Sequence, residues 1–309
     1  SLVGLFACSI PVRQARLDPL AEPTRAEIDA AERARTRSCG PTVGYLWPGI
    51  GQACVGRREE GLALAGLAAA EAGAGIALLQ AHPPSGLESA FEQTGPMVPL
   101  ILLQDTYVYS LSRSAVDQQL ARWLHYTPQD ELPELIAAPF NTRVLRRPGV
   151  WAGVLGLTGA AVAVDLALGS IEADPGGDTN VFGWTAPAPH GYPLLGAAGV
   201  ATFSHVAIAE EISFRGLLQS GLVRSFGDET AGWAVSSLIF GAFHGLNAIG
   251  IADDRTRRDY LLYALPWITL TGSYLGLVYR WNGYSLTGPV AIHFWYDLLL
   301  TAVQFTLQP

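Results

Sequence analysis

Residues Glu210–Gly216 have the sequence EEISFRG and lie inside an apolar segment that runs from about residue 194 to 223. A charge in the hydrocarbon of a bilayer is costly, so charged residues in such a segment usually face one another or a polar cavity. On a helix, Glu211 and Arg215 share a face in the order that favours an ion pair. Glu210 is rotated by about 100° from Glu211. The stretch therefore indicates either one paired and one free carboxylate for chemistry, or a structural ion pair beside an acid without a role.

Two later apolar segments carry further titratable side chains. Phe240 and His244 lie in one of them (FGAFH), and His293 and Asp297 lie in the other (HFWYD). His293 and Asp297 are four residues apart and project from one helical face. A single histidine on an apolar face is more often a hydrogen-bonded core residue than a ligand. Two histidines together with Asp297 and Glu210 form a set that can bind a metal ion or activate water.

In this order, the motifs Glu-Glu-x-x-x-Arg, Phe-x-x-x-His and His-x-x-x-Asn/Asp resemble the CPBP family of intramembrane proteases. That family includes the type II CAAX prenyl endopeptidases and the bacterial Abi and bacteriocin-immunity proteins. The resemblance covers roughly residues 194–305. It implies a metal-dependent intramembrane endopeptidase whose active site lies between membrane helices.

The resemblance also implies roles for individual side chains. Glu210 is expected to act as the general base and His244 to assist in activating the water. His293 and Asp297 are expected to hold a metal ion or the oxyanion. These four residues are the candidate catalytic set.

Three further side chains are expected to support that set. Glu211 and Arg215 would form an ion pair that fixes the helix and the orientation of Glu210. Phe240 completes the supporting group, since it precedes His244 by one helical turn.

Asp297 departs from the pattern of many family members, which carry Asn at this position. An ionised aspartate only accepts hydrogen bonds and would repel an oxyanion. Asp297 is therefore expected to ligate a cation or to orient His293. Two histidines and a carboxylate with an open position are a common catalytic zinc arrangement. We expect a divalent metal, zinc, held by His244, His293 and Asp297.

The composition indicates a polytopic membrane protein. Half of the 309 residues are hydrophobic and only 15% are charged, which is too little charge for the surface of a soluble protein of this length. The net charge of −8 argues against a nucleic-acid partner. The expected partners are the lipid bilayer and a membrane-associated protein or peptide substrate, and the expected location is the bacterial inner membrane. The three cysteines have no metal-binding spacing.

We expect an all-α transmembrane bundle of about seven spans, each near the length of about 20 residues that crosses a bilayer. Arginines before residues 61 and 149, and at Arg224 and Arg280, predict cytoplasmic boundaries there. A Gly-, Pro- and Asp-rich stretch from 172 to 192 is expected to be an exposed loop. The expected spans are 61–81, 97–111, 150–170, 194–223, 230–250, 260–279 and 288–306.

The chain divides into four predicted parts. Residues 1–40 are a polar segment, in which the sequence around Cys8 resembles a lipoprotein cleavage site or is the frayed end of an apolar segment. Residues 41–111 are a membrane hairpin that begins with a turn of sequence PGIGQ. Residues 112–147 are a polar connector, and residues 148–309 are the CPBP-like protease domain.

Three acids lie in otherwise apolar segments, namely Glu71, Asp105 and Asp165. They either satisfy neighbouring groups through hydrogen bonds or line a polar vestibule, and the structural interpretation is favoured. Two other functions stay open for the whole chain. One is a catalytically inactive scaffold or immunity-type partner-binding protein. The other is a transporter that relays protons, although such a protein is expected to show internal repeats and none is found.

Overall fold

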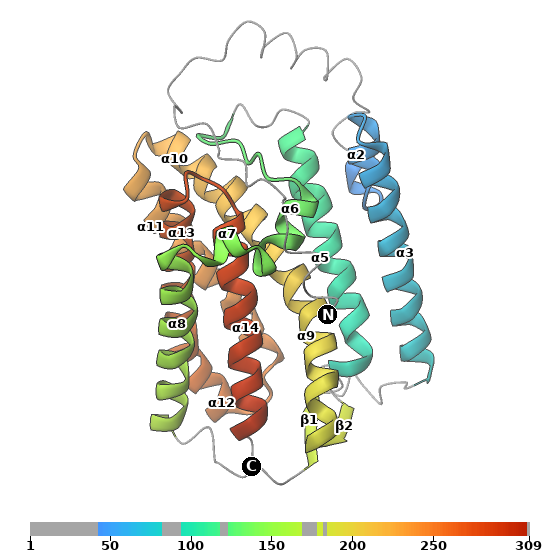
Figure 1. Cartoon of the computed structure of the whole chain (residues 1–309), viewed down its shortest axis with the longest axis vertical. Coiled ribbons are helices and arrows are strands. Elements are labelled where there is room, and N and C mark those ends of the chain that lie inside the picture. Colours follow the sequence, from blue (N-terminus) through green and yellow to red (C-terminus); the bar gives the residue numbers. More distant parts are fainter. Residues whose placement is uncertain (1–42, 82–93, 118–122, 169–177, 182–183, 308–309) are drawn as a thin grey trace, which may run out of the picture.

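The computed structural model describes residues 43–81, 94–117, 123–168, 178–181 and 184–307. The predicted polar segment 1–40, with Cys8, lies outside these residues. The described chain is a helical bundle with one short β-hairpin (Figure 1). Its helical elements are η2 (Val43–Tyr45), α2 (Ile50–Cys54), α3 (Arg58–Ala81), α5 (Thr94–Asp117), α6 (Leu132–Ala137), η4 (Ala138–Phe140), α7 (Thr142–Leu145), α8 (Pro148–Leu168), α9 (Ala188–Glu210), η5 (Glu211–Gln219), α10 (Ser220–Phe226), α11 (Glu229–His244), η6 (Gly245–Gly250), α12 (Asp254–Asp259), η7 (Tyr260–Ala264), α13 (Leu265–Trp281) and α14 (Thr287–Leu307).

Helices occupy each of the seven segments in which a membrane span was expected. Within the described ranges, four helical stretches are long and apolar enough to cross a bilayer: Arg58–Ala81, Gly149–Leu166, Gly191–Phe226 and Asp254–Trp281. Helices α5, α11 and α14 occupy the other expected spans. The total of about seven spans stays a prediction.

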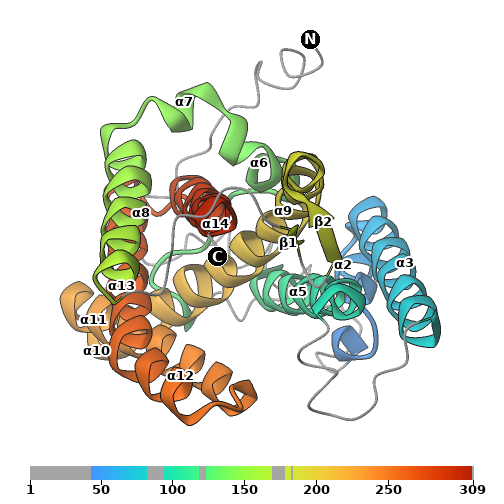
Figure 2. The same ribbon diagram turned by 90° about the horizontal axis from the view of Figure 1, so that it is seen from below.

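The long helices pack side by side in a row across the bundle. Helix α3 lies at one edge against α5, α5 packs on α9, α9 on α14, and α14 on α8 (Figures 1 and 2). Helices α11 and α13 pack against each other, and η5 contacts α5, α11 and α13. The η5 segment therefore lies where the N-terminal hairpin and the C-terminal helices meet.

A short hairpin corrects the expectation of a plain loop between residues 172 and 192. Strands β1 (Asp178–Val181) and β2 (Trp184–Pro187) pair antiparallel, and α9 begins directly after β2. Thr179, Val181, Trp184 and Thr185 favour extended backbone over helix, which explains the pairing. The fold is helical with this one exception among the described residues.

The PGIGQ turn attaches α3 to α5. Gly49 adopts a φ of 87°, and a Cβ there would lie 2.0 Å from the carbonyl oxygen of Gly61, so only glycine fits. The Gly49 N–H donates to Ser110 Oγ at 2.9 Å, and Gln52 Nε2 donates to the Ser110 carbonyl at 2.9 Å. Gln52 is fully buried, and its Oε1 also accepts a hydrogen bond from Ser110 Oγ at 3.0 Å, so both ends of its amide are paired.

In its described part, the predicted polar connector is hydrogen-bonded to two helices of the bundle. Asp130 accepts hydrogen bonds from the backbone N–H of Leu286 at 2.8 Å and from Ser285 Oγ at 2.7 Å, directly before α14. Its carbonyl oxygen accepts from Arg113 Nη1 of α5 at 2.9 Å. The connector therefore ties α5 to the start of α14, the helix that carries His293.

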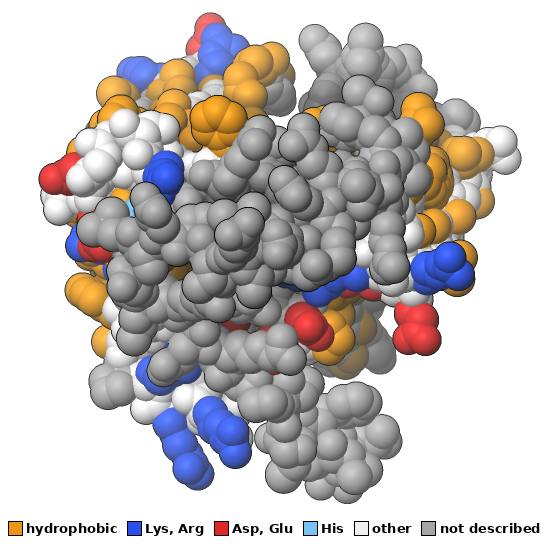
Figure 3. Space-filling model, turned by 90° about the horizontal axis from the view of Figure 1, so that it is seen from above, with side chains coloured by type: hydrophobic (Ala, Val, Ile, Leu, Met, Phe, Trp, Pro, Cys, Tyr) orange, Lys and Arg blue, Asp and Glu red, His pale blue; other side chains and the backbone are white. Residues whose placement is uncertain are grey.

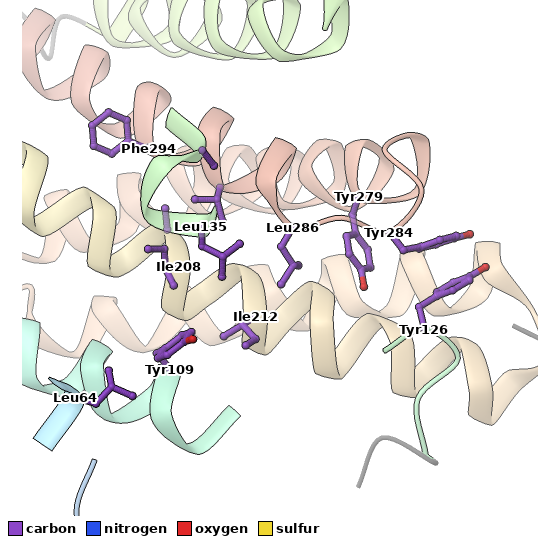
Figure 4. Packing of buried hydrophobic residues seen from close by; sticks show 13 residues of the cluster. Leu64, Tyr109, Tyr126, Leu135, Ile208, Ile212, Tyr279, Tyr284, Leu286 and Phe294 are labelled. Atoms are coloured by element: carbon purple, nitrogen blue, oxygen red, sulfur yellow. The ribbon is translucent and has the colours of Figure 1, made fainter. Parts of the chain in front are cut away.

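The main apolar core surrounds the α9–η5 junction. Ile208 and Ile212 are buried there, on either side of the two glutamates. Figure 4 shows how they pack with side chains from α3, α5, α6, α13 and α14, including Leu64, Tyr109, Leu135, Tyr279, Leu286 and Phe294. This packing fixes the position of the junction relative to the surrounding helices.

One end of the bundle carries several charged side chains. Arg57 pairs with Glu60 at 2.6 Å at the start of α3, and Arg280 pairs with Glu229 at 2.6 Å where α13 ends and α11 begins. Seen from above, Arg and acidic side chains lie beside apolar side chains on this face (Figure 3). The end of α10 and the end of α13, which carry the arginines that predict cytoplasmic boundaries, both lie at the upper end of the bundle in Figure 1.

Candidate active site

The site is built where α9 changes its winding. Helix α9 ends at Glu210, and the following segment Glu211–Gln219 is a π-helix. Such wider turns occur often at functional sites. The two adjacent glutamates have different surroundings: the Glu211 side chain is fully buried, whereas 21% of the Glu210 side chain is exposed.

Glu210 lies between the two histidines. Its Oε1 is 3.7 Å from His244 Nε2, and its Oε2 is 3.8 Å from His293 Nε2. The three side chains come from the end of α9, the end of α11 and the middle of α14. The structure therefore brings together three candidates that lie far apart in the sequence, with Glu210 at the centre.

His244 presents a defined nitrogen to Glu210. Its Nδ1 lies 2.9 Å from the carbonyl oxygen of Phe240. A carbonyl only accepts, so Nδ1 donates in this hydrogen bond, and Nε2 is the nitrogen that faces Glu210. The hydroxyl of Tyr260 donates to the His244 carbonyl at 2.8 Å, which further fixes the end of α11.

His293 is held by carboxylates on both sides of its ring. Its Nδ1 lies 2.8 Å from Glu211 Oε1, and its Nε2 lies 3.4 Å from Asp297 Oδ2. Glu211 therefore orients His293 in addition to its expected partner Arg215. This contact joins residues 82 positions apart and has no signal in the local sequence pattern.

Arg215 is almost completely buried and has three partners. Its Nη1 donates to Glu211 Oε1 at 3.0 Å, and its Nη2 donates to the Gly272 carbonyl at 2.8 Å. The guanidinium carbon lies 4.4 Å from the centre of the Phe240 ring, within the range of a cation–π contact. A Cβ at Gly272 would lie 2.4 Å from that ring, so glycine allows α13 to approach this closely.

Two carboxylate oxygen atoms at the site are free to accept hydrogen bonds. Within the described part of the chain, Glu210 Oε2 and Glu211 Oε2 are buried without a hydrogen-bond partner. Buried polar atoms are normally paired with protein or ordered water. The oxygen on Glu210 is therefore suited to accept a proton donor such as water.

Two of the three expected zinc ligands, His244 and His293, lie on either side of Glu210, and the third, Asp297, lies beside His293. No group of three or more His, Cys, Asp or Glu side chains in the described ranges is arranged to hold a metal ion. His293 uses Nδ1 for Glu211, which leaves only Nε2 for any further contact. Zinc at His244, His293 and Asp297 therefore stays a prediction.

A neighbouring polar cluster was only partly anticipated. The sequence indicates Glu71 and Asp105 as acids in apolar segments, whereas the three motifs do not include His205. His205 Nε2 lies 3.2 Å from Glu71 Oε1. A histidine in the same apolar segment as Glu210 was the available signal.

Comparison with known proteins gives one family. Residues 193–299 match the family model described as Type II CAAX prenyl endopeptidase Rce1-like. This match confirms the resemblance that the three motifs predicted for the same part of the chain. No curated protein and no solved structure shows significant similarity to the chain.

Proposed function

Because residues 193–299 form an Rce1-like domain of the CPBP protease family, we propose that Glu210 activates water for hydrolysis of a peptide bond in a membrane-associated substrate. This family is a protease family. Together with the helices of this chain that are long and apolar enough to cross a bilayer, the match indicates an integral membrane protein. One observation carries the mechanistic proposal: Glu210 lies between the Nε2 atoms of His244 and His293.

Peptide hydrolysis requires a base for the water, a donor for the oxyanion and a proton for the leaving amine. Glu210 accepts a proton from water while the oxygen forms a bond to the carbonyl carbon. The same carboxyl group then gives this proton to the nitrogen as the carbon–nitrogen bond breaks. His244 positions the water through Nε2, because its Nδ1 is engaged by the Phe240 carbonyl.

His293 is the proposed donor to the oxyanion. Carboxylates lie beside both of its ring nitrogens, and a doubly protonated ring satisfies them with two N–H donors. Its Nε2 also lies 3.8 Å from Glu210 Oε2, so this N–H is close to a substrate carbonyl held beside Glu210 and donates to the oxyanion in place of Asp297. Asp297 holds this ring in place. This role agrees with one of the two expectations for Asp297, that it orients His293.

The substrate and location are further parts of the proposal. We assign the protein to a bacterial inner membrane, with the end that carries Arg57, Arg224 and Arg280 facing the cytoplasm. The family match is of the CAAX-protease type. A peptide whose farnesylated cysteine is followed by three C-terminal residues is therefore the first substrate to test, beside the same peptide without the lipid.

The proposed function is tested by comparing peptide cleavage by the Glu210→Gln variant with cleavage by the wild type. Internally quenched peptides, with and without the farnesyl group, are added to protein in liposomes. We expect cleavage by the wild type and a loss of about 10²–10⁴-fold in the variant. Asp165→Asn is the matched control, because Asp165 lies in α8 and accepts a hydrogen bond from Gln304 at 3.3 Å. Cleavage that survives Glu210→Gln would refute this role, and a wild type without any cleavage would favour the inactive scaffold.

A further inference from the structure

A pocket lies beside η5 and α10, the helices that lead from the active site to the upper end of the bundle in Figure 1. Its volume of about 810 Å³ is within the range of sites that hold small ligands. The mechanism above uses none of the side chains that line it. This lining is apolar except near one end of α10, and it includes Trp123, Leu217, Leu218, Gly221, Leu222 and Arg224.

Hydrogen bonds between the connector and α10 hold the two sides of this pocket together. The His125 N–H donates to the Ser220 carbonyl at 3.1 Å, and the Tyr126 N–H donates to Ser220 Oγ at 2.7 Å. Ser220 Oγ donates in turn to the Tyr126 carbonyl at 2.7 Å. Trp123 comes directly before this paired segment, and 63% of it is exposed. The pocket is therefore a fixed feature of the fold with an aromatic side chain at its edge.

Arg224 brings a positive charge to the pocket that no described acid neutralises. It is exposed, and the two acids that follow α10 are engaged elsewhere. Asp228 accepts a hydrogen bond from the Ala231 N–H at 2.6 Å, and Glu229 pairs with Arg280 at 2.6 Å. Among the described residues, no acidic side chain forms an ion pair with Arg224. An apolar pocket with one uncompensated cation beside it fits a ligand that has an apolar chain and an anionic head.

The position of the pocket indicates where such a ligand comes from. Tryptophan is enriched where a membrane meets water, and arginines mark the cytoplasmic side. Basic pockets between membrane helices on that side bind the head groups of anionic lipids. A free phosphate ion would leave the leucine side chains without a partner, and a zwitterionic lipid brings its own cation to the phosphate.

We propose that this pocket binds one anionic phospholipid of the membrane, with an acyl chain against Leu217, Leu218 and Leu222 and the phosphate at the Arg224 guanidinium. Gly221 leaves room for the chain, because a Cβ there would meet its nearest neighbour, Leu124, only at 3.9 Å. The lipid then contacts η5, the same segment that carries Glu211 and Arg215. This site is separate from the catalytic residues and does not depend on hydrolysis.

Photo-crosslinking locates the lipid without any peptide substrate. The protein is placed in phosphatidylcholine liposomes that contain a small share of phosphatidylglycerol with a diazirine on one acyl chain. Labelled peptides are then identified by mass spectrometry. Because every lipid-facing helix collects some label, the labelling of residues 217–225 is divided by the labelling around Leu155, an exposed residue of α8. We expect unlabelled phosphatidylglycerol to lower this ratio and inorganic phosphate to leave it unchanged.

Two substitutions test the two parts of the proposed site. Arg224→Gln removes the charge, and we expect the labelling ratio to fall about fivefold, whereas Arg224→Lys should keep most of it. Gly221→Phe fills the pocket and keeps the arginine, so we expect a fall of similar size. Arg58→Gln is the matched control, because Arg58 is an exposed arginine at the start of α3 at the same end. It should leave the ratio at the wild-type value. Unfolding curves of each variant confirm that the protein is folded.

Three results would overturn the lipid site. One is a wild-type ratio in Arg224→Gln, which indicates ordinary contact with bulk lipid. Another is an equal fall in Arg224→Gln and Arg58→Gln, which indicates a general attraction of anionic lipid to this end. The third is displacement of the probe by the farnesylated peptide and not by phosphatidylglycerol, which assigns the pocket to the substrate. A failure of the proposed function is a different result, since it is seen only as cleavage that does not depend on Glu210.

Discussion

Two acid–arginine pairs in this protein have the same chemistry and very different surroundings. Glu211 and Arg215 lie in η5, with 0% and 2% of their side chains exposed. Glu229 and Arg280 lie near one end of the bundle, with 39% and 26% exposed. Removing one member of a buried pair leaves a charge that neither water nor protein stabilises, whereas an exposed pair exchanges its partner for water. The comparison indicates that burial decides how much stability is lost when one member of an acid–arginine pair is removed.

The largest expected effect follows from removing the buried arginine. Arg215→Ala leaves Glu211 without its cation and the Gly272 carbonyl without its donor. We expect a loss of about 3–5 kcal/mol in the free energy of unfolding. Cleavage should also be lost, because Glu211 orients His293. Thermal and denaturant unfolding in detergent measure the first quantity, and the peptide assay measures the second.

Arg280→Ala is the matched control for that substitution. Its pair with Glu229 is partly exposed, so we expect a cost of about 0–1 kcal/mol. Equal losses of stability in Arg215→Ala and Arg280→Ala would refute the distinction between the two pairs.

Asp297→Asn separates a role in orienting His293 from a role in binding zinc. The distance of 3.4 Å to His293 Nε2 leads us to expect about tenfold slower cleavage, as the charge-assisted contact weakens, with metal content unchanged. The zinc prediction requires metal content to fall together with activity. Metal analysis of the purified wild type, Asp297→Asn and Asp165→Asn distinguishes these outcomes. Faster cleavage by Asp297→Asn would indicate instead that residue 297 donates to the oxyanion.

The smallest effect concerns the exposed pair at low pH. Burial acts to raise the pKa of Glu229, but hydrogen bonds from Tyr126, Tyr284 and Arg280 outweigh it, so the pKa is lowered from 4.5. A carboxyl group whose folded pKa is lowered contributes stability above its unfolded pKa and loses it as pH falls through the folded value.

The stability difference between the wild type and Glu229→Gln should therefore shrink as pH falls below about 4.5. Unfolding curves at several pH values measure this. A difference that stays constant across the acid range would show that Glu229 does not supply this dependence.

Local helical periodicity predicted the contacts within one helix. The spacing of Glu211 and Arg215 and of His293 and Asp297 placed each pair on one face, and both pairs are in contact. The order of the motifs predicted the family domain, which the match to residues 193–299 confirms. These inferences succeeded because side chains four residues apart on a helix meet whatever the helix packs against.

Contacts between helices could not be predicted in the same way. The bond between His293 and Glu211 depends on how α14 packs on the α9–η5 junction, and Glu229 reaches Arg280 across 51 residues. The hairpin β1–β2 and the π-helical winding of η5 also depend on tertiary context. The structural interpretation of buried acids suits Asp165, which Gln304 satisfies. Glu71 and Asp105 each keep an unpaired oxygen, which only the structure reveals.

The central claim is that the carboxylate at position 210 is the base for water, and chemical rescue tests it most directly. Glu210→Ala removes the base and leaves room for a small carboxylate, since a fifth of the Glu210 side chain is exposed. We predict that added formate restores part of the cleavage of the farnesylated peptide in Glu210→Ala, with saturating dependence on formate. It should restore none in Glu211→Ala, whose site is sealed. Equal rescue of both variants, or no rescue of Glu210→Ala, would contradict the assignment of Glu210 as the base.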